Sequence, residues 1–150
     1  MNESKQPNYR GIFLEPDKIC YQEIDGPLRK LIELINGQSW LMSYGCCAGQ
    51  AHHGTDAGLE HQFYLGLFVD ETTDGVARLR RWLEEANRLN GPTGLVAEMT
   101  GVYQHPFGQG SVDGWASYRI TAHVRKDTVH ASPQTYLRLI KCLQTAWGRW

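Results

Sequence analysis

The stretch WASYRITAHV, residues 115–124, has the clearest strand pattern in this 150-residue chain. Its side chains alternate in character, so that Ala116, Tyr118 and Ile120 fall on one side and Ser117, Arg119 and Thr121 on the other. Successive side chains of a strand point to opposite faces, so this period of two predicts a strand with one apolar and one polar face. The sequence therefore predicts a sheet whose apolar face is covered by other elements of the protein.

Four more segments predict strands of the same sheet. Residues 95–103 alternate in the same way, and the apolar run FYLGLFVD at 63–70 suits a strand covered on at least one face. Residues 39–44 are aromatic and apolar. A short apolar segment at Gly11–Leu14, stopped by Pro16, predicts an edge strand.

Three segments have helical spacing of apolar residues with helix-starting and helix-ending signals. They begin at Pro27, at Thr73 or Asp74, and at Ser132-Pro133, and the third has an apolar stripe that continues to Trp150. The resulting order predicts an α+β two-layer sandwich, with five mostly antiparallel strands and three helices on one face. Its first six elements match the ferredoxin-like βαββαβ pattern, to which a strand and a helix are added.

Composition limits the classes of function. One domain over residues 1–150 is expected, with residues 1–10 as a loose leader. Fifteen Lys and Arg balance sixteen Asp and Glu without a run of one sign, which argues against a nonspecific nucleic-acid surface. The N-terminal residues lack a secretory pattern and no apolar run could span a bilayer, so a cytoplasmic protein with reduced thiols and no membrane contact is expected.

The run SYGCCAGQAHHGTDAGLEH, residues 43–61, concentrates metal-binding side chains between two apolar segments. Its donors are Cys46, Cys47, His52, His53 and His61. Zinc or another transition metal needs three or four converging Cys, His or carboxylate donors. Neighbouring side chains on an extended backbone point apart, so one residue of each adjacent pair is expected to serve. The spacing does not match a zinc finger.

The same run also offers a reactive thiol. Cys47 could act as nucleophile or ligand and His53 as base or ligand, with Glu98 or His123 as the partner in proton transfer. The alternative is that the cysteine packs as a small apolar side chain at the end of its strand.

A third interpretation is a glycine-rich ligand loop. Gly45 and Gly49 would let the backbone approach a small polar ligand, with Gln50 beside them. A second glycine-rich loop at residues 104–114 contains His105, and Arg119 follows on the next strand. If the sheet brings the two loops together, they would form one pocket; the alternative is two solvent-facing connections.

The segment IDGPLRKLIELINGQSWLMSYGCCAGQ resembles the opening motif of the wybutosine-synthesis methyltransferase-like family, which modifies a tRNA guanosine with S-adenosylmethionine. The matching residues are Leu31, Ile32, Ile35, Asn36, Cys47 and Gly49, and Gln50 stands where the family has an arginine. The resemblance implies an S-adenosylmethionine-dependent RNA-modifying enzyme.

Three functions from different classes therefore remain. The expected one is binding of a small polar ligand or a metal ion at the Cys/His/Gly-rich run, with or without catalysis. The second is the RNA-modifying enzyme. The third is a non-catalytic interaction module that forms a homo-oligomer through an apolar patch around Trp147 and Trp150.

Overall fold

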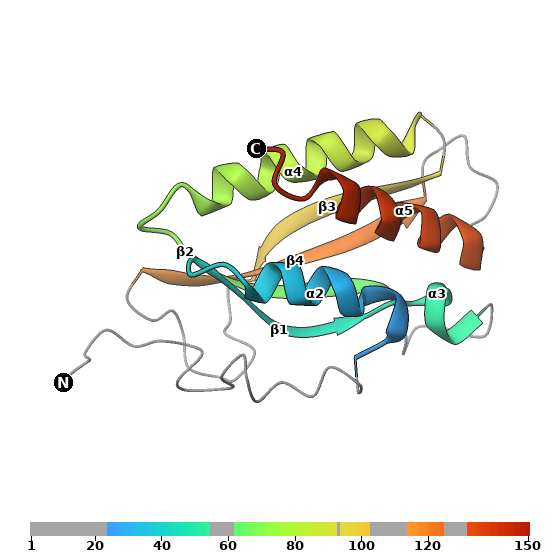
Figure 1. The fold of residues 1–150 in the computed structure, drawn as a ribbon, viewed down its shortest axis with the longest axis horizontal. Coiled ribbons are helices and arrows are strands. Elements are labelled where there is room, and N and C mark those ends of the chain that lie inside the picture. Colours follow the sequence, from blue (N-terminus) through green and yellow to red (C-terminus); the bar gives the residue numbers. More distant parts are fainter. Residues whose placement is uncertain (1–23, 55–61, 93, 103–113, 125–131) are drawn as a thin grey trace.

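A computed structural model describes residues 24–54, 62–92, 94–102, 114–124 and 132–150. Four strands form one antiparallel sheet in the order β1-β2-β4-β3 (Figure 1). Their bounds are Leu41–Cys47 for β1, Tyr64–Asp70 for β2, Leu95–Val102 for β3 and Trp115–Val124 for β4. The prediction of an α+β protein with an antiparallel sheet is confirmed.

The helices lie where the helix-starting and helix-ending signals of the sequence predict them, except for the short helix α3. The 3₁₀ helix η3 (Gly26–Leu28) leads into α2 (Arg29–Asn36), α3 (Gln50–His53) follows β1, and α4 (Gly75–Asn90) joins β2 to β3. The last helix, α5 (Pro133–Ala146), begins with a capping box in which Ser132 and Thr135 satisfy each other's backbone N–H groups.

One face of the sheet forms the core with the helices α2, α4 and α5, which lie over it in Figure 1. The apolar side chains of the alternating strands meet the apolar stripes of these helices there. The largest fully buried members of this core include Trp82, Leu31, Ile32, Leu65 and Leu67. Along β3, burial follows the period of two from Leu95 to Met99. In β4, Ile120 is buried on this face, whereas Trp115 and Ser117 are buried on the opposite face, which was predicted to be polar.

The predicted ferredoxin-like order is wrong in one respect. Such a sheet would place the first strand of the chain between β2 and β3, whereas β4 occupies that position and pairs antiparallel with both neighbours. As in a ferredoxin-like sheet, β2 and β3 are connected by the helix α4 and have one other strand between them. The predicted fifth strand at 11–14 and the leader at 1–10 lie outside the described residues.

The strand predicted at residues 39–44 is longer than expected, so the loop that follows it starts later than Gly45. β1 continues through Cys47 because Cys46 and Cys47 pair with Leu65 and Tyr64, across an irregularity between Ser43 and Gly45. The next residues, Gln50–His53, form the short helix α3, so the described part contains four α-helices rather than three.

The opposite face of the sheet has a small apolar cluster of its own, made of Met42, Phe68 and Trp115 with Tyr44 packed against it. The ring of Tyr44 lies directly over Gly66, where an added Cβ would come within 2.4 Å of the ring. Gly66 is therefore the residue that makes room for Tyr44 on β2.

The tryptophans near the end of the chain pack against one another rather than forming a separate apolar patch. Trp147 contacts Trp82 edge to face at 4.8 Å, and Trp150 contacts Trp147 at 4.9 Å and Trp40 at 5.9 Å between ring centroids. Trp147 and Trp150 are half-buried by these contacts. The apolar patch expected around Trp147 and Trp150 therefore consists of partly buried side chains that pack against the core.

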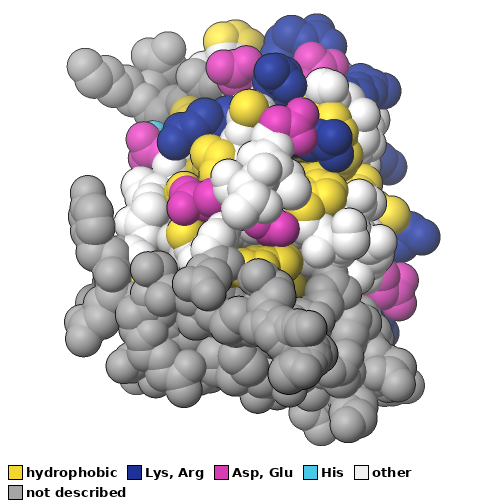
Figure 2. Space-filling model, turned by 90° about the vertical axis from the view of Figure 1, so that its left-hand side faces the viewer, with side chains coloured by type: hydrophobic (Ala, Val, Ile, Leu, Met, Phe, Trp, Pro, Cys, Tyr) yellow, Lys and Arg dark blue, Asp and Glu magenta, His cyan; other side chains and the backbone are white. Residues whose placement is uncertain are grey.

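Among the described residues, no helix combines the length and the apolar character needed to cross a bilayer. On the face shown in Figure 2, side chains of Lys and Arg interleave with those of Asp and Glu over the described part of the surface. This mixture agrees with the near-neutral net charge and differs from the basic stripe typical of nonspecific nucleic-acid binding.

Candidate metal centre

Three side chains from three separate segments converge at one end of the sheet. Asp25 directly precedes η3, Cys47 ends β1, and His53 is the last residue of α3. One carboxylate oxygen, the Cys47 Sγ and one imidazole nitrogen lie within 4.8 Å of one another. The group takes one residue from each adjacent pair, Cys46/Cys47 and His52/His53.

Asp25 lies at the centre of this group. Its Oδ2 accepts a hydrogen bond from the backbone N–H of Ala48 at 2.9 Å and lies 3.4 Å from the Nε2 of His53. Its Oδ1 lies 3.7 Å from the Nε2 of His52. Each carboxylate oxygen therefore faces one imidazole, and either contact becomes an ion pair when that imidazole is protonated.

The backbone at Gly49 positions the histidines. Gly49 has a φ of 59°, and an added Cβ would lie 2.9 Å from the backbone nitrogen of Phe63. A residue with a side chain would be strained there, both by the left-handed conformation and by the close approach. Gly49 starts α3, whose N–H groups of His52 and His53 bond back to the Gly49 carbonyl. This turn directs His53 toward Cys47 and Asp25.

Burial raises the pKa of both Cys46 and Cys47. Cys47 is 9% exposed, and desolvation raises its pKa while the N–H of Gly49, 3.5 Å from Sγ, lowers it by a smaller amount. Desolvation, with the negative charge of Asp25 as the next cause, raises the pKa of Cys46 to about 12. Both are therefore thiols at neutral pH, which disfavours a free thiolate nucleophile. A metal ion would displace the proton of Cys47.

The distance between Asp25 and His53 suits two ligands of a tetrahedral ion. Zinc bonds to oxygen and nitrogen at about 2.0–2.1 Å, so two such ligands on a tetrahedron are about 3.3–3.4 Å apart. The separation of Asp25 Oδ2 from His53 Nε2 is 3.4 Å. The Sγ of Cys47 lies within 4.8 Å of one carboxylate oxygen of Asp25 and of one imidazole nitrogen of His53. Asp25, Cys47 and His53 are thus three residues of the types that bind zinc, close enough together to be candidate ligands.

The other predicted proton partners lie elsewhere. His123 Nδ1 is 3.6 Å from Glu98 Oε1, and both side chains are more than half exposed. Across the sheet, Cys47 pairs with Tyr64, Tyr64 with Thr121 and Thr121 with Glu98. Glu98 is therefore three strand spacings, about 14 Å, from Cys47 along the backbone register. The structure forms a Glu98–His123 pair that is separate from the Asp25–Cys47–His53 group.

Arg119, one of the predicted ligand-binding residues, stacks on an aromatic ring. Its guanidinium lies over the ring of Tyr64 at 4.7 Å, a cation–π contact on the polar face of the sheet.

The residues of the predicted ligand loop have separate surroundings. Gly45 lies in β1 beneath Tyr64, whose hydroxyl would be 3.0 Å from an added Cβ. Gln50 begins α3, and its Oε1 is buried with no hydrogen-bond partner in the described part of the chain. His61, His105 and residues 104–113 of the second loop lie outside the described residues.

Asp25 is the member of this candidate group that the sequence did not reveal. Its position before Gly26-Pro27 is typical of a helix cap, yet its side chain makes no cap hydrogen bond and reaches Ala48 instead. The only local signal was an acidic residue at the start of a helix with Pro at its first turns, and that signal is shared by many helix starts.

Comparison of the chain with protein-family models, with proteins of curated function and with solved structures finds no match. Function is therefore inferred from the chemistry of the side chains.

Proposed function

We propose that this protein binds a transition-metal ion, with zinc as the first choice, through Asp25, Cys47 and His53. The observation that supports the proposal is the convergence of three donor atoms from three different segments within 4.8 Å. One thiolate, one imidazole and one carboxylate form a mixed set of borderline softness, which zinc accepts in tetrahedral geometry.

Three protein ligands leave the fourth position of the tetrahedron open. Zinc sites that bind a small molecule or a water keep such a position, whereas purely structural sites fill it from the protein. His52 is the nearest further donor, because its Nε2 is 3.7 Å from the other oxygen of Asp25. The small polar ligand expected from the sequence would bind at this fourth position.

A metal-free alternative uses the same contacts. Asp25 could simply hold Ala48 and form ion pairs with two protonated histidines at the surface. Such exposed pairs contribute little to stability, typically less than about 1 kcal/mol. The two interpretations differ in their dependence on Cys47, because a thiol takes no part in the ion pairs but is a principal ligand of a zinc ion.

The experiment is a titration of the metal-free protein with Co²⁺, a spectroscopic substitute for zinc, followed by competition with Zn²⁺. We expect one equivalent to give visible bands typical of tetrahedral cobalt and a charge-transfer band from a thiolate. Cys47→Ser should abolish the charge-transfer band, while Cys46→Ser, which changes the adjacent thiol, should keep it. A spectrum that is lost equally in both variants, or absent from the wild type, would contradict the proposal.

The two histidines give a second matched pair. His53→Gln should weaken Zn²⁺ binding at least about 100-fold, because loss of outer-shell partners alone already costs 10–100-fold in metal affinity. His52→Gln should weaken it by less than about 10-fold if His52 only lies beside the site. Equal effects of both substitutions would mean that the imidazoles act as a pair around Asp25 rather than as one ligand.

The RNA-modifying activity implied by the sequence resemblance stays a separate prediction. Four of its six matching residues have structural explanations: Leu31, Ile32 and Ile35 are buried, and Asn36 bonds the backbone N–H of Ser43 at 2.9 Å. Calorimetric titration with S-adenosylmethionine tests this activity directly, since absence of heat argues against it and leaves the metal proposal untouched.

A further inference from the structure

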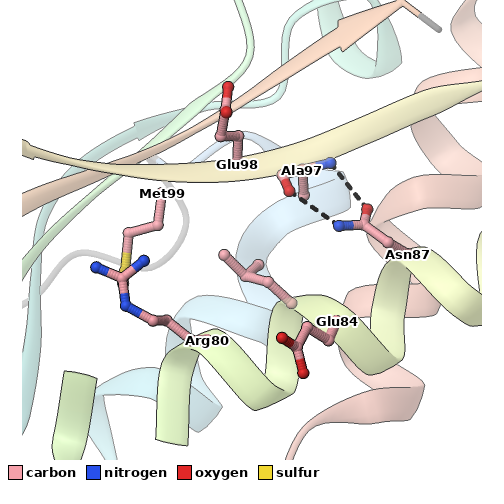
Figure 3. A pocket seen from close by; sticks show the side chains of 7 residues that line it. Arg80, Glu84, Asn87, Ala97, Glu98 and Met99 are labelled. Atoms are coloured by element: carbon pink, nitrogen blue, oxygen red, sulfur yellow. Dashed lines mark hydrogen bonds between the residues drawn. The ribbon is translucent and has the colours of Figure 1, made fainter. Parts of the chain in front are cut away.

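The edge strand β3 is closed along its first half by side chains of α4. The carboxamide of Asn87 donates to the carbonyl of Ala97 at 3.0 Å and accepts from its N–H at 2.9 Å. Asn90 donates to the carbonyl of Leu95 at 2.9 Å. Figure 3 shows the paired bonds between Asn87 and Ala97. These side chains occupy the positions that a further strand would take.

The second half of the same edge is open. Because both backbone groups of Ala97 bond away from β4, the alternation of an antiparallel ladder directs those of Met99 and Gly101 away from β4 as well. In the described part of the chain these four groups have no hydrogen-bond partner. We call the outward backbone groups of Met99 and Gly101 the open edge.

A shallow pocket of about 270 Å³ lies between α4 and this edge. Arg80 and Glu84 of α4 line it together with Met99, while Glu98 points to the other side of β3 (Figure 3). Arg80 and Glu84 are exposed and carry one charge of each sign. Such a surface has no net charge that would select a basic or an acidic peptide, but it can meet a copy of itself without net repulsion.

We propose that the open edge binds a second copy of this chain, so that the four described strands of each copy join through β3 into one continuous antiparallel sheet. A twofold axis at Thr100 places Met99 opposite the partner's Gly101 and Gly101 opposite the partner's Met99. This register gives a hydrogen-bond partner to all four open backbone groups of each copy. The pairing ends before Ala97, because the outward groups of Ala97 are already bonded to Asn87.

The side chains agree with this register. Thr100 would lie opposite the partner's Thr100, a cross-strand pair that favours sheet formation. Glu98 would lie opposite the partner's Val102, so no two like charges are placed directly across the seam. The contact is short, and a weak dimer that depends on protein concentration is therefore expected.

The test is sedimentation equilibrium of the full chain in EDTA, which excludes association through a shared metal ion. We expect a monomer–dimer equilibrium. Gly101→Pro removes one outward N–H without removing a bond to β4, and it should weaken the dimer at least about tenfold. Gly101→Ala keeps the N–H, and its added Cβ would meet only Tyr118 at 3.9 Å, so its dimer should match the wild type.

A charge exchange tests the register itself. Thr100→Lys and Thr100→Glu should each weaken self-association, because each variant opposes like charges, and an equimolar mixture of the two should restore the dimer. A chain that stays monomeric at every concentration would overturn the proposal. A dimer that is indifferent to Gly101→Pro and to the Thr100 variants would also overturn it, and neither result bears on the metal site.

Discussion

The carboxylate of Asp25 accepts a hydrogen bond from the backbone N–H of Ala48, a residue 23 positions further along the chain, at 2.9 Å. Ala48 is fully buried, so its N–H has no access to water. The bond fixes the same oxygen that faces His53. The contact therefore ties the start of the first helix to the end of β1 and orients a ligand of the proposed metal.

The Asp25–Ala48 bond should contribute to stability without any metal. Asp25→Ala leaves the buried N–H of Ala48 unpaired, which costs about 1–3 kcal/mol. Asp25→Asn keeps an acceptor oxygen and should cost less than half as much. Urea unfolding of the metal-free proteins measures both. Equal losses for the two variants would show that the charge of Asp25, rather than its hydrogen bond, stabilises the fold.

The contact between Tyr44 and Gly66 predicts a severe effect of a small substitution. In Gly66→Ala the added Cβ would lie 2.4 Å from the Tyr44 ring, so the ring or the strand must move, at a cost of about 1–3 kcal/mol. Tyr44→Ala provides the room, and the cost of Gly66→Ala should fall in that background. A double-mutant cycle by thermal or urea unfolding tests this, and additive losses would contradict the steric explanation.

The sequence predicted those elements whose periodicity is local. The strand at residues 115–124 has the bounds of β4, and the helix signals at Ser132-Pro133 and Asn90-Gly91 mark the start of α5 and the end of α4. The position of β4 in the sheet was not predictable in this way. Strand order depends on contacts between distant segments, and the alternation along β4 is the same at the centre of a sheet and at its edge.

The candidate site was predictable only in part, for the same reason. Cys47 and His53 are clustered in sequence and composition pointed to them. Asp25 reaches the site across a separation that no local pattern encodes. Glu98 and His123 were grouped with the site because both were placed on polar strand faces. In the sheet, however, two strands lie between Glu98 and Cys47, and one strand lies between His123 and Cys47.

Asn87 should protect the edge of the sheet. Asn87→Ala removes both hydrogen bonds to Ala97, and a net loss of about 1–2 kcal/mol is expected, since each bond contributes roughly 0.5–1.5 kcal/mol when water can replace it. Hydrogen exchange by NMR should show faster exchange of the Ala97 amide, while amides that bond β3 to β4 stay protected. Asn87→Asp keeps the acceptor for this amide, and unchanged protection in Asn87→Ala would contradict the assignment.

Glu85 predicts a defined dependence of stability on pH. Hydrogen bonds from Arg88 at 2.6 and 2.9 Å and from Arg149 at 3.1 Å lower the pKa of Glu85 to about 2. A carboxyl whose pKa is lower in the folded than in the unfolded chain stabilises the fold above the unfolded value. That contribution is lost as the pH falls from about 4.5 to about 2.

The variant Glu85→Gln isolates this effect. It should unfold more easily than the wild type at neutral pH, and the difference should vanish as the pH approaches 2. Because the pair is exposed, high salt should also reduce the difference. Thermal unfolding from pH 7 to pH 2 measures it; a difference that persists at the acid end would assign the effect to packing of the side chain rather than to its charge.

Anomalous diffraction at the zinc absorption edge, from crystals of the full chain grown with one equivalent of Zn²⁺, tests the central proposal most directly. We predict one peak about 2.0–2.3 Å from Asp25 Oδ2, Cys47 Sγ and His53 Nε2 together. A peak on exposed histidines away from Cys47, or no peak at this end of the sheet, would contradict it.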